Sequence, residues 1–171
     1  KPSTSKRCPE HKIYPYLLRD VEVTEVDQVW CSDITYIPMP RGHCYLVAIM
    51  DWHSRAVLAW EVSNTMDTAF CLRALQRAFE RAGRKPKVFN TDQGSQYTSP
   101  DWVKAIEDQD IKVSMDGKGR WMDNVFIERL WRSVKYEKLR LWSYETVRDV
   151  SGLVGEWMDF YNYRRSHSTL G

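Results

Sequence analysis

Three apolar segments that follow one another with only short turns between them restrict the fold more than any other feature of the sequence. They span Val29–Met39, Tyr45–Asp51 and Ala56–Val62, and the turns between them are Pro40–His43 and Trp52–Arg55. Strands with such short connections pair antiparallel, so we expect a three-stranded meander. The middle segment is apolar at almost every position, which predicts a central place in a larger sheet.

The remainder of the chain predicts helices that alternate with short strands. A helix capped by Asn64 and Asp67 runs to about Arg81 and leads into a strand at Lys87–Asn90, which the helical crossover makes parallel within the sheet. Further elements are a loop at 91–97, a helix opened by Ser99-Pro100, a strand at 111–114, a mobile basic loop at 115–121, a helix at 124–139 and a last helix from a Ser143 cap to about Asn162. The sequence therefore predicts an α/β fold, in which helices flank a mixed five-stranded sheet of three antiparallel and two parallel strands.

Length and composition indicate one domain. The chain has 171 residues, of which 43% are hydrophobic and 28% charged, and its net charge of +2 does not by itself indicate a nucleic-acid partner. We expect residues 1–20 to be an arm or linker and residues 21–171 to form the core domain; a start at Lys1 instead of Met predicts a fragment. No apolar run reaches the roughly 20 residues of a membrane span and no signal peptide is visible, so we expect a cytoplasmic protein with no membrane partner.

The four cysteines do not form a metal-ligand pattern. Cys31 and Cys71 lie in apolar surroundings and are expected to be reduced core thiols. Cys8 and His11 could supply half a zinc site, but no second pair matches them, which argues against zinc.

Three carboxylates are candidates for one site. Asp33 interrupts an apolar strand, Asp92 follows the strand that ends at Asn90, and Glu128 lies in the helix that begins near Asn124. If the first two strands are neighbours, both acids emerge near one end of the sheet, and the loop before the helix can bring Glu128 to the same edge. Like charges at close range resist ionising together, so such a group needs a cation. Mg²⁺, or two such ions about 4 Å apart, suits carboxylate oxygens and phosphoryl transfer.

Each acid also has an ordinary structural interpretation. Asp33 could hydrogen-bond locally, Asp92 could form an Asx turn before Gly94, and Glu128 could pair with Arg132. Taken singly, these interpretations are favoured, and only the joint placement of the three acids favours a functional site.

Several motifs resemble one known family. They are the segments 30–36 (WCSDITY), 90–99 (NTDQGSQYTS), 123–124 with 128–135, and 161–168, and 35 residues separate Asp92 from Glu128. The chain is similar, from about residue 12 to its end, to the retroviral-integrase-type catalytic core of bacterial insertion-sequence transposases, which carry an Asp-Asp-Glu triad. A departure from the family pattern is Ser166, which stands where proline is common.

The resemblance implies a ribonuclease H-like fold and makes residues 21–171 an integrase-type catalytic core. It implies that Asp33, Asp92 and Glu128 are both the catalytic residues and the ligands of Mg²⁺ or Mn²⁺, with two ions bound. The implied activity is cleavage of the element's DNA ends, followed by joining of the freed 3′-OH to target DNA in a bacterial cytoplasm. The family's N-terminal helix-turn-helix part and a short C-terminal piece are expected to lie outside this sequence.

Basic residues near Glu128 predict a DNA-binding surface. Residues 118–140 contain seven Lys or Arg and three Asp or Glu, a surplus of four positive charges that suits a phosphate track or, alternatively, a solvated helix face. Asn124, Trp131, Arg132 and Lys135 share a helix face with Glu128, and Lys135 is the leading DNA-contact candidate. The candidate DNA-binding residues are Lys135, Arg132, Arg129, Lys118, Arg120, Gln93, Gly94, Ser95 and Asn124.

Aromatic residues and assembly leave further alternatives. Trp121, Trp131 and Tyr97 either stack on an unpaired base or pack in the core. By resemblance, the partners are DNA and further copies of the chain, with no small-molecule substrate. A ribonuclease H-type nuclease that does not join strands, and an inert DNA-binding or oligomerisation domain, remain the alternative functions.

Overall fold

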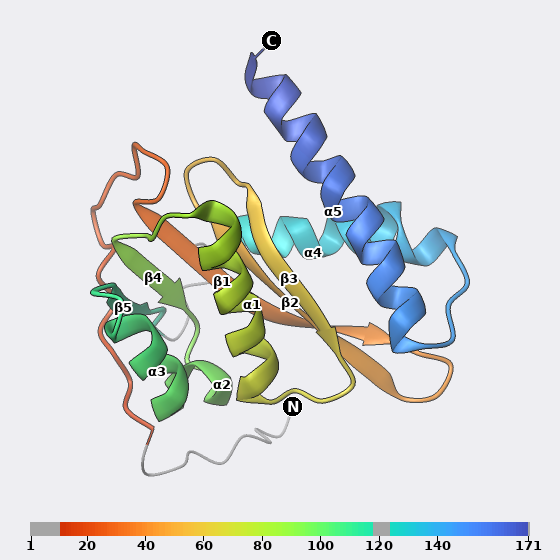
Figure 1. The fold of residues 1–171 in the computed structure, drawn as a ribbon, viewed down its shortest axis with the longest axis horizontal. Helices are drawn as coiled ribbons and strands as arrows, with labels where there is room; N and C mark the ends of the chain where they lie inside the picture. The colour runs from red at the N-terminus through yellow and green to blue at the C-terminus, as the bar shows by residue number, and fades with distance from the viewer. Residues whose placement is uncertain (1–10, 118–123, 171) are drawn as a thin grey trace.

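The fold is that of a computed structural model, in which residues 11–117 and 124–170 are described, residues 166–170 by their backbone alone. Its sheet has five strands in the order β3-β2-β1-β4-β5 (Figure 1). Their bounds are β1 Val29–Pro38, β2 His43–Asp51, β3 Val57–Ser63, β4 Val88–Thr91 and β5 Lys112–Met115.

The pairing of the strands confirms the predicted mixed sheet. β1 pairs antiparallel with β2, and β2 antiparallel with β3, which gives the meander. β4 lies parallel to β1 and β5 parallel to β4. β2 lies inside the sheet and is buried at nearly every position, as its apolar sequence predicts.

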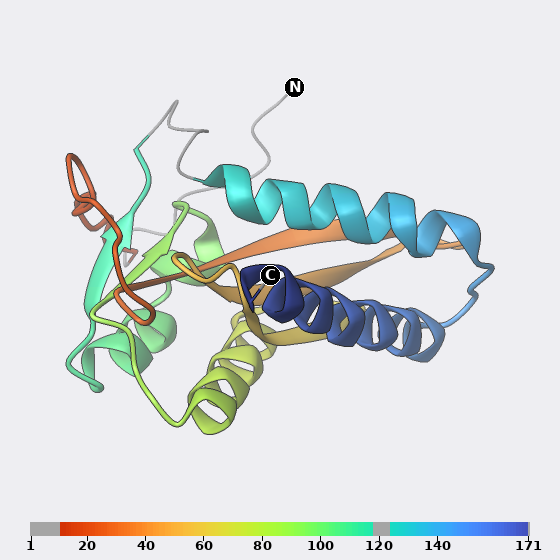
Figure 2. The ribbon, with the colours of Figure 1, turned by 90° about the horizontal axis from the view of Figure 1, so that it is seen from above.

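Helices cover both faces of this sheet. The helices are α1 Thr68–Ala82, α2 Ser95–Thr98, α3 Pro100–Glu107, α4 Val125–Glu137 and α5 Val147–Leu170, and a 3₁₀ turn, η2, spans Leu139–Leu141. Figure 2 shows the long strands between α4 on one side and α1 on the other. None of the helices in the described part of the chain has both the length and the apolar character needed to cross a bilayer.

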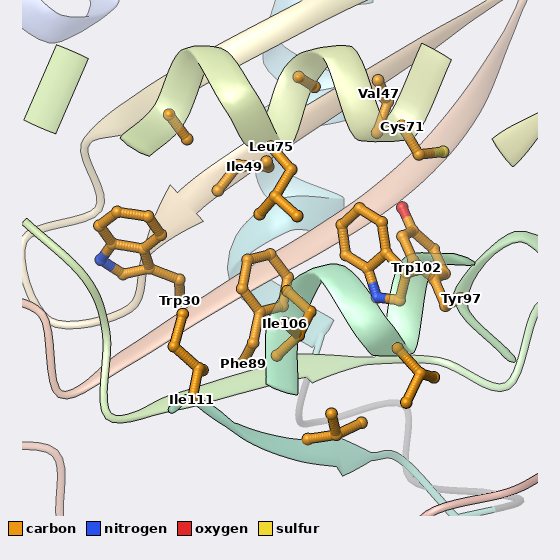
Figure 3. Close-up of a cluster of buried hydrophobic side chains, with 14 of the residues drawn as sticks. Trp30, Val47, Ile49, Cys71, Leu75, Phe89, Tyr97, Trp102, Ile106 and Ile111 are labelled. Carbon is orange, nitrogen blue, oxygen red and sulfur yellow. The ribbon is translucent and has the colours of Figure 1, made fainter. Parts of the chain in front are cut away.

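The core divides into two clusters, one for each face. The face that α1 and α3 cover holds large aromatic side chains from several elements, among them Trp30, Phe89 and Trp102 (Figure 3). Phe89 and Trp102 meet edge to face, with ring centroids 5.4 Å apart. The second cluster lies between the sheet and helices α4 and α5 and contains Ile127, Val134 and Val154, among others. Cys31 and Cys71 are free and buried, as predicted for core thiols, and Cys44 is free and buried as well.

Helix termini follow the predicted signals in two cases. The Asp67 side chain accepts a hydrogen bond from Phe70 N at 3.0 Å and caps α1, and Gly83 follows the helix with a left-handed φ of 61°. The expected part of Asn64 in this cap is wrong, because α1 begins only at Thr68. Ser99 caps α3 by accepting from Trp102 N, with Pro100 in the first turn.

The last helix differs from the prediction at both ends. The expected Ser143 cap is wrong, because α5 begins at Val147 and runs to Leu170 instead of ending near residue 162. Thr146 and Asp149 form a reciprocal cap: Asp149 N donates to Thr146 Oγ1 and Thr146 N donates to Asp149 Oδ2, each at 3.1 Å. In addition, the segment expected to be a loop at 91–97 begins with the last residue of β4, Thr91, and its second half belongs to the short helix α2, which ends at Thr98.

Residues 11–18 lie along the outer edge of β5. Leu17 N donates to Ser114 Oγ at 3.0 Å, and Met115 N donates to the Pro15 carbonyl at 3.4 Å. Leu18 is buried, and His11 hydrogen-bonds Thr98 of α2 through Nδ1 at 2.9 Å. This part of the expected arm is thus packed against the sheet, and the domain boundary at residue 20 stays a prediction.

Residues of the motif at 161–168, in the C-terminal part of α5, bind the outer edge of β3 and the turn before it. The Asn162 amide accepts from Val57 N at 3.0 Å and donates to the Val57 carbonyl at 2.9 Å, as a neighbouring strand would. Tyr161 Oη donates to the Arg55 carbonyl at 2.9 Å, and Arg165 Nη1 donates to the Ser54 carbonyl at 2.6 Å. These contacts hold α5 beside β3, beyond which its C-terminal part projects (Figure 1).

We expect replacement of Asn162 by Ala to destabilise the protein by about 1–3 kcal/mol, because both polar backbone groups of Val57 lose their side-chain partner. Urea unfolding followed by circular dichroism measures this loss. Arg164→Ala, at an exposed position of the same helix, is the control and should change stability little. Equal unfolding midpoints for the two variants would contradict the structural role of Asn162.

Candidate active site at the β1–β4 edge

Asp33 and Asp92 are brought together by the parallel pairing of β1 with β4. The last paired residues are Cys31 and Asn90, and each acid lies two residues further along its own strand direction. Both acids line one cavity of about 220 Å³, together with Gly94 and Gln96 among other residues. The expected neighbourhood of the two strands is therefore correct, and two of the three candidate acids share a cavity.

Asp33 is the buried member of the pair, with only 8% of its surface exposed. Burial raises the pKa of its carboxyl to about 7, and the negative charge of Asp92 and, more weakly, that of Glu128 add to this effect. The Trp131 indole opposes it, because Nε1 donates a hydrogen bond to Asp33 Oδ2 at 3.1 Å and so favours the ionised form.

Asp92 is half-buried and forms the Asx turn that its sequence allowed. Its Oδ1 accepts a hydrogen bond from Gly94 N at 2.7 Å. Gly94 has a φ of −60°, so a left-handed turn does not explain the glycine. The close approach of Asp92 explains why residue 94 is glycine, since a Cβ on residue 94 would lie 2.9 Å from Asp92 Oδ1. The turn fixes Asp92 and leaves its carboxylate at the cavity.

Glu128 lies in the first turn of α4 and is exposed. Its charge contributes to the raised pKa of Asp33, which places it in the electrostatic neighbourhood of the cavity, although it does not line that cavity. The alternative Glu128–Arg132 ion pair does not occur within the described part of the chain. Across residues 11–117 and 124–170, no three His, Cys, Asp or Glu side chains are close enough to hold a metal ion as they stand.

Lys135 also reaches β1 from α4. Its Nζ donates to Thr35 Oγ1 at 2.6 Å and is half-buried. Burial lowers the pKa of this ammonium group, while the carboxylates of Glu128 and Asp33 act in the opposite direction. Lys135, the leading DNA-contact candidate, is therefore held against β1, near enough to Glu128 and Asp33 for their charges to act on its ammonium group.

The spacing of side chains along α4 matches that along β1 where the contacts of Trp131 and Lys135 form. Asp33 and Thr35 lie on one face of β1, and side chains two apart on a strand are separated by about 6.7 Å. Trp131 and Lys135 are one helical turn apart on α4, about 6 Å along its axis. The near equality lets two successive pairs, Asp33–Trp131 and Thr35–Lys135, form side by side.

The remaining DNA-binding candidates occupy different surroundings. Arg129 and Arg132 are exposed on α4, and Ser95 is exposed at the start of α2. Gln93 is half-buried, and its amide donates to the Asp116 carbonyl at 2.9 Å. Asn124 Oδ1 is buried without a hydrogen-bond partner among the described residues. Lys118 and Arg120, like most of the predicted basic loop, lie outside the described residues.

Core packing is the correct interpretation for two of the candidate stacking residues. Tyr97 is only 1% exposed and its hydroxyl hydrogen-bonds Ser32 Oγ at 2.9 Å. Trp131 is buried as well, and its contact with Asp33 was not foreseen. Helical spacing places Trp131 on the side of α4 that carries the exposed Glu128, so it does not predict a buried indole; the contact with Asp33 follows from the way α4 packs on β1. Trp121 lies outside the described residues.

Solved structures with the same arrangement define the class of fold. The catalytic core domain of HTLV-2 integrase in complex with magnesium (dimeric form) aligns with a TM-score of 0.54 and 22% identity, over 64% of this chain and 68% of that one. The simian T-cell lymphotropic virus intasome in complex with the PP2A regulatory subunit B56 gamma aligns with a TM-score of 0.60 and 20% identity, over 78% of this chain and 45% of that one. The fold is thus ribonuclease H-like, as in retroviral integrase cores.

Sequence comparison identifies the family. Two family models, both described as integrase core domain, match residues 23–120 and residues 109–171, and the chain belongs to this family. It is 30% identical over 159 residues to the transposase for insertion sequence element IS904 of Lactococcus lactis subsp. lactis (strain IL1403), covering 91% of this chain and 63% of that protein. It is 32% identical over 157 residues to transposase InsF for insertion sequence IS3A of Escherichia coli (strain K12), covering 91% of this chain and 54% of that protein. The chain therefore spans less than two thirds of the length of these relatives.

The raised pKa of Asp33 predicts a pH-dependent stability in the absence of divalent ions. Between the unfolded pKa of about 3.9 and the folded pKa of about 7, the folded state binds more protons than the unfolded state. This contribution to stability is therefore complete below the unfolded pKa and is lost as the pH rises through about 7. Asp33→Asn cannot ionise, so its stability relative to the wild type should increase across this range.

Urea unfolding in EDTA at several pH values between about 4 and 8 measures that difference. Asp101→Asn, which changes an exposed acid on α3, is the matched control and should show no such trend. A constant difference between Asp33→Asn and wild type across the range would contradict the assigned environment of Asp33.

Proposed function

We propose that the chain is the catalytic core of a bacterial insertion-sequence transposase, which cleaves the element's DNA ends and joins the freed 3′-OH to target DNA. The observation that carries this proposal is the meeting of Asp33 and Asp92 at one cavity, in a chain of the integrase core domain family. The similarity to transposases of two bacterial insertion sequences supports DNA as the substrate and the bacterial cytoplasm as the location.

The acids fit a hard divalent cation. Asp33 and Asp92 offer carboxylate oxygens to one cavity, and their mutual repulsion, visible in the raised pKa of Asp33, is the kind that a cation relieves. We assign Asp33, Asp92 and Glu128 as catalytic residues and ligands of Mg²⁺ or Mn²⁺, with two ions bound; Glu128 joins after a shift at the start of α4. Such ions lower the pKa of an attacking hydroxyl and stabilise the leaving oxygen in phosphoryl transfer.

The protein's own residues supply positioning and charge around these ligands. Trp131 donates to Oδ2 of Asp33 and so helps to orient this carboxylate, which lines the cavity. The Asx turn at Gly94 orients Asp92 in a similar way. Lys135 and the exposed Arg129 and Arg132 extend the surface along α4 with positive charge for the DNA backbone. Gln93, Gly94, Ser95, Asn124, Lys118 and Arg120 complete the proposed DNA-binding set.

Assembly on DNA is part of the proposal. One structural relative, the catalytic core domain of HTLV-2 integrase, is a dimeric form in complex with magnesium, which supports a homo-oligomer here as well as the metal. A small-molecule substrate and a membrane partner are not part of the proposal.

A nuclease of the ribonuclease H type would use the same acids to cleave strands without joining them. An inert relative would neither cleave nor join strands. A DNA end with a free 3′-OH, incubated with Mn²⁺ and a target plasmid, separates these functions. Joined product supports the transposase, cleavage of the plasmid alone supports the nuclease, and absence of both supports an inert relative.

In the same assay, we expect Asp92→Asn to reduce joined product by about 100-fold or more, because the variant loses a charged metal ligand. Its circular dichroism spectrum should remain that of the wild type. Asp101→Asn is the matched control for loss of an exposed acid and should join DNA normally. Wild-type joining by Asp92→Asn would overturn the proposed triad.

Arg132→Gln should weaken DNA binding for all sequences and lower the slope of log affinity against log salt by about 1, since one phosphate contact is lost. Fluorescence anisotropy of a labelled duplex between low and moderate salt measures the slope. Arg81→Gln, at an exposed position of α1 on the opposite face of the sheet, is the control. Identical slopes for both variants would remove Arg132 from the DNA-binding surface.

A further inference from the structure

The cavity that holds the two acids also has an apolar wall. Asp33 and Asp92 form part of its lining, while Ile34, Tyr36 and Met66 form another part. Tyr36 is 59% exposed and Met66 is 39% exposed, so this wall faces solvent. A cavity for phosphate alone needs polar donors and ligands; one that also has apolar side chains suits the rest of a nucleotide.

Residues of both sheet faces reach one cavity because β1 continues well beyond the last residue that pairs with β4. β1 runs to Pro38, but its pairing with β4 stops at Cys31. Within the described residues, the following part of β1 thus has a strand neighbour only on the β2 side. Asp33 on one face and Tyr36 on the other both border this open edge.

The Tyr36 ring is held from behind by two other rings. It meets Tyr45, its direct cross-strand partner on β2, with ring centroids 5.6 Å apart at an interplanar angle of 67°. It lies 5.4 Å from the His43 ring, and His43 Nε2 and the Tyr45 hydroxyl are hydrogen-bonded at 2.8 Å. These contacts stabilise the hairpin, yet more than half of Tyr36 stays exposed, and the residue lines the cavity.

We propose that Tyr36, supported by His43 and Tyr45, is a stacking platform for one unpaired base of the DNA strand whose phosphate lies at the acids. This inference rests on the proposed function, which places a phosphodiester beside Asp33 and Asp92. The base attached to a neighbouring sugar then falls within reach of the apolar wall. Base pairs in a duplex have both faces occupied by their neighbours, so a single exposed ring selects a base that has left the stack.

Stacking on an aromatic side chain is tolerant of base identity, because every base has a π-face. The platform would therefore position the strand without reading its sequence. This suits a fixed chemical centre that acts on different target sequences, and it makes Tyr36 a substrate-positioning residue, separate from the metal ligands.

The test uses DNA with a short unpaired end that carries 2-aminopurine at one position at a time, with Ca²⁺ present to allow binding without cleavage. Wild-type protein and Tyr36→Phe should quench the fluorescence at one or two adjacent positions, since stacking quenches this base. Tyr36→Leu should lose the quenching and bind the unpaired end about tenfold more weakly, while its affinity for fully paired duplex stays unchanged. Tyr163→Leu, which changes a similarly exposed tyrosine on α5, is the matched control.

Two results would overturn the proposal: quenching by Tyr36→Leu equal to the wild type, or no quenching by the wild type at any position. The second result would favour a structural or protein-contacting role for the aromatic cluster. If Tyr36→Leu does not fold, photocrosslinking of wild-type protein to 5-iodouracil DNA decides the question. A crosslinked peptide that contains Tyr36 supports the platform, and crosslinks only elsewhere exclude it.

The outcome is separable from the proposed function. Joining of DNA by the wild type, together with unaltered quenching by Tyr36→Leu, removes the platform and leaves the transposase assignment in place. Failure of the wild type to join DNA removes that assignment, whatever the quenching shows.

Discussion

The short parallel pairing of β1 with β4 is the constraint on which the rest of the structure depends. Only Val29, Trp30 and Cys31 of β1 pair with β4, through Val88, Phe89 and Asn90. This contact joins the antiparallel meander to the parallel half of the sheet. Because the pairing stops just before Asp33 and Asp92, it sets both acids at one edge and leaves the later part of β1 open beside them.

Placing the acids at that edge has an electrostatic cost that the surrounding structure limits. A carboxyl as buried as that of Asp33 resists ionisation, more so with Asp92 nearby. Helix α4 supplies opposing interactions from the other side of the cluster, through the indole of Trp131 and the ammonium group of Lys135. The apolar residues of α4, such as Ile127 and Val134, hold the helix on the sheet and so keep these groups in place.

Much of this arrangement follows from the sequence, because strong local signals dominate in the sheet. Apolar segments joined by short turns predict the meander, and the crossover through α1 predicts the parallel direction of β4. Signals that depend on single side chains were less informative. Ser143 and Thr146 are both capable caps, and only the reciprocal partner Asp149 distinguishes them.

The position of the site is also predictable from the sequence, but its detailed contacts are not. The order of elements brings Asp33 and Asp92 together, whereas the indole contact of Trp131 depends on how α4 docks on β1, which no local pattern specifies. Periodicity alone also does not separate a partly exposed aromatic such as Tyr36 from a buried one such as Tyr97.

The outer strands of the sheet are both covered by segments that are not strands. On β3, the Asn162 amide occupies both polar backbone groups of Val57, and on β5 the segment 11–18 bonds to Ser114 and Met115. Uncovered strand edges invite intermolecular pairing and aggregation. At Val57 and at Met115, therefore, the polar backbone groups that these segments bind are not available for pairing with a strand of another molecule.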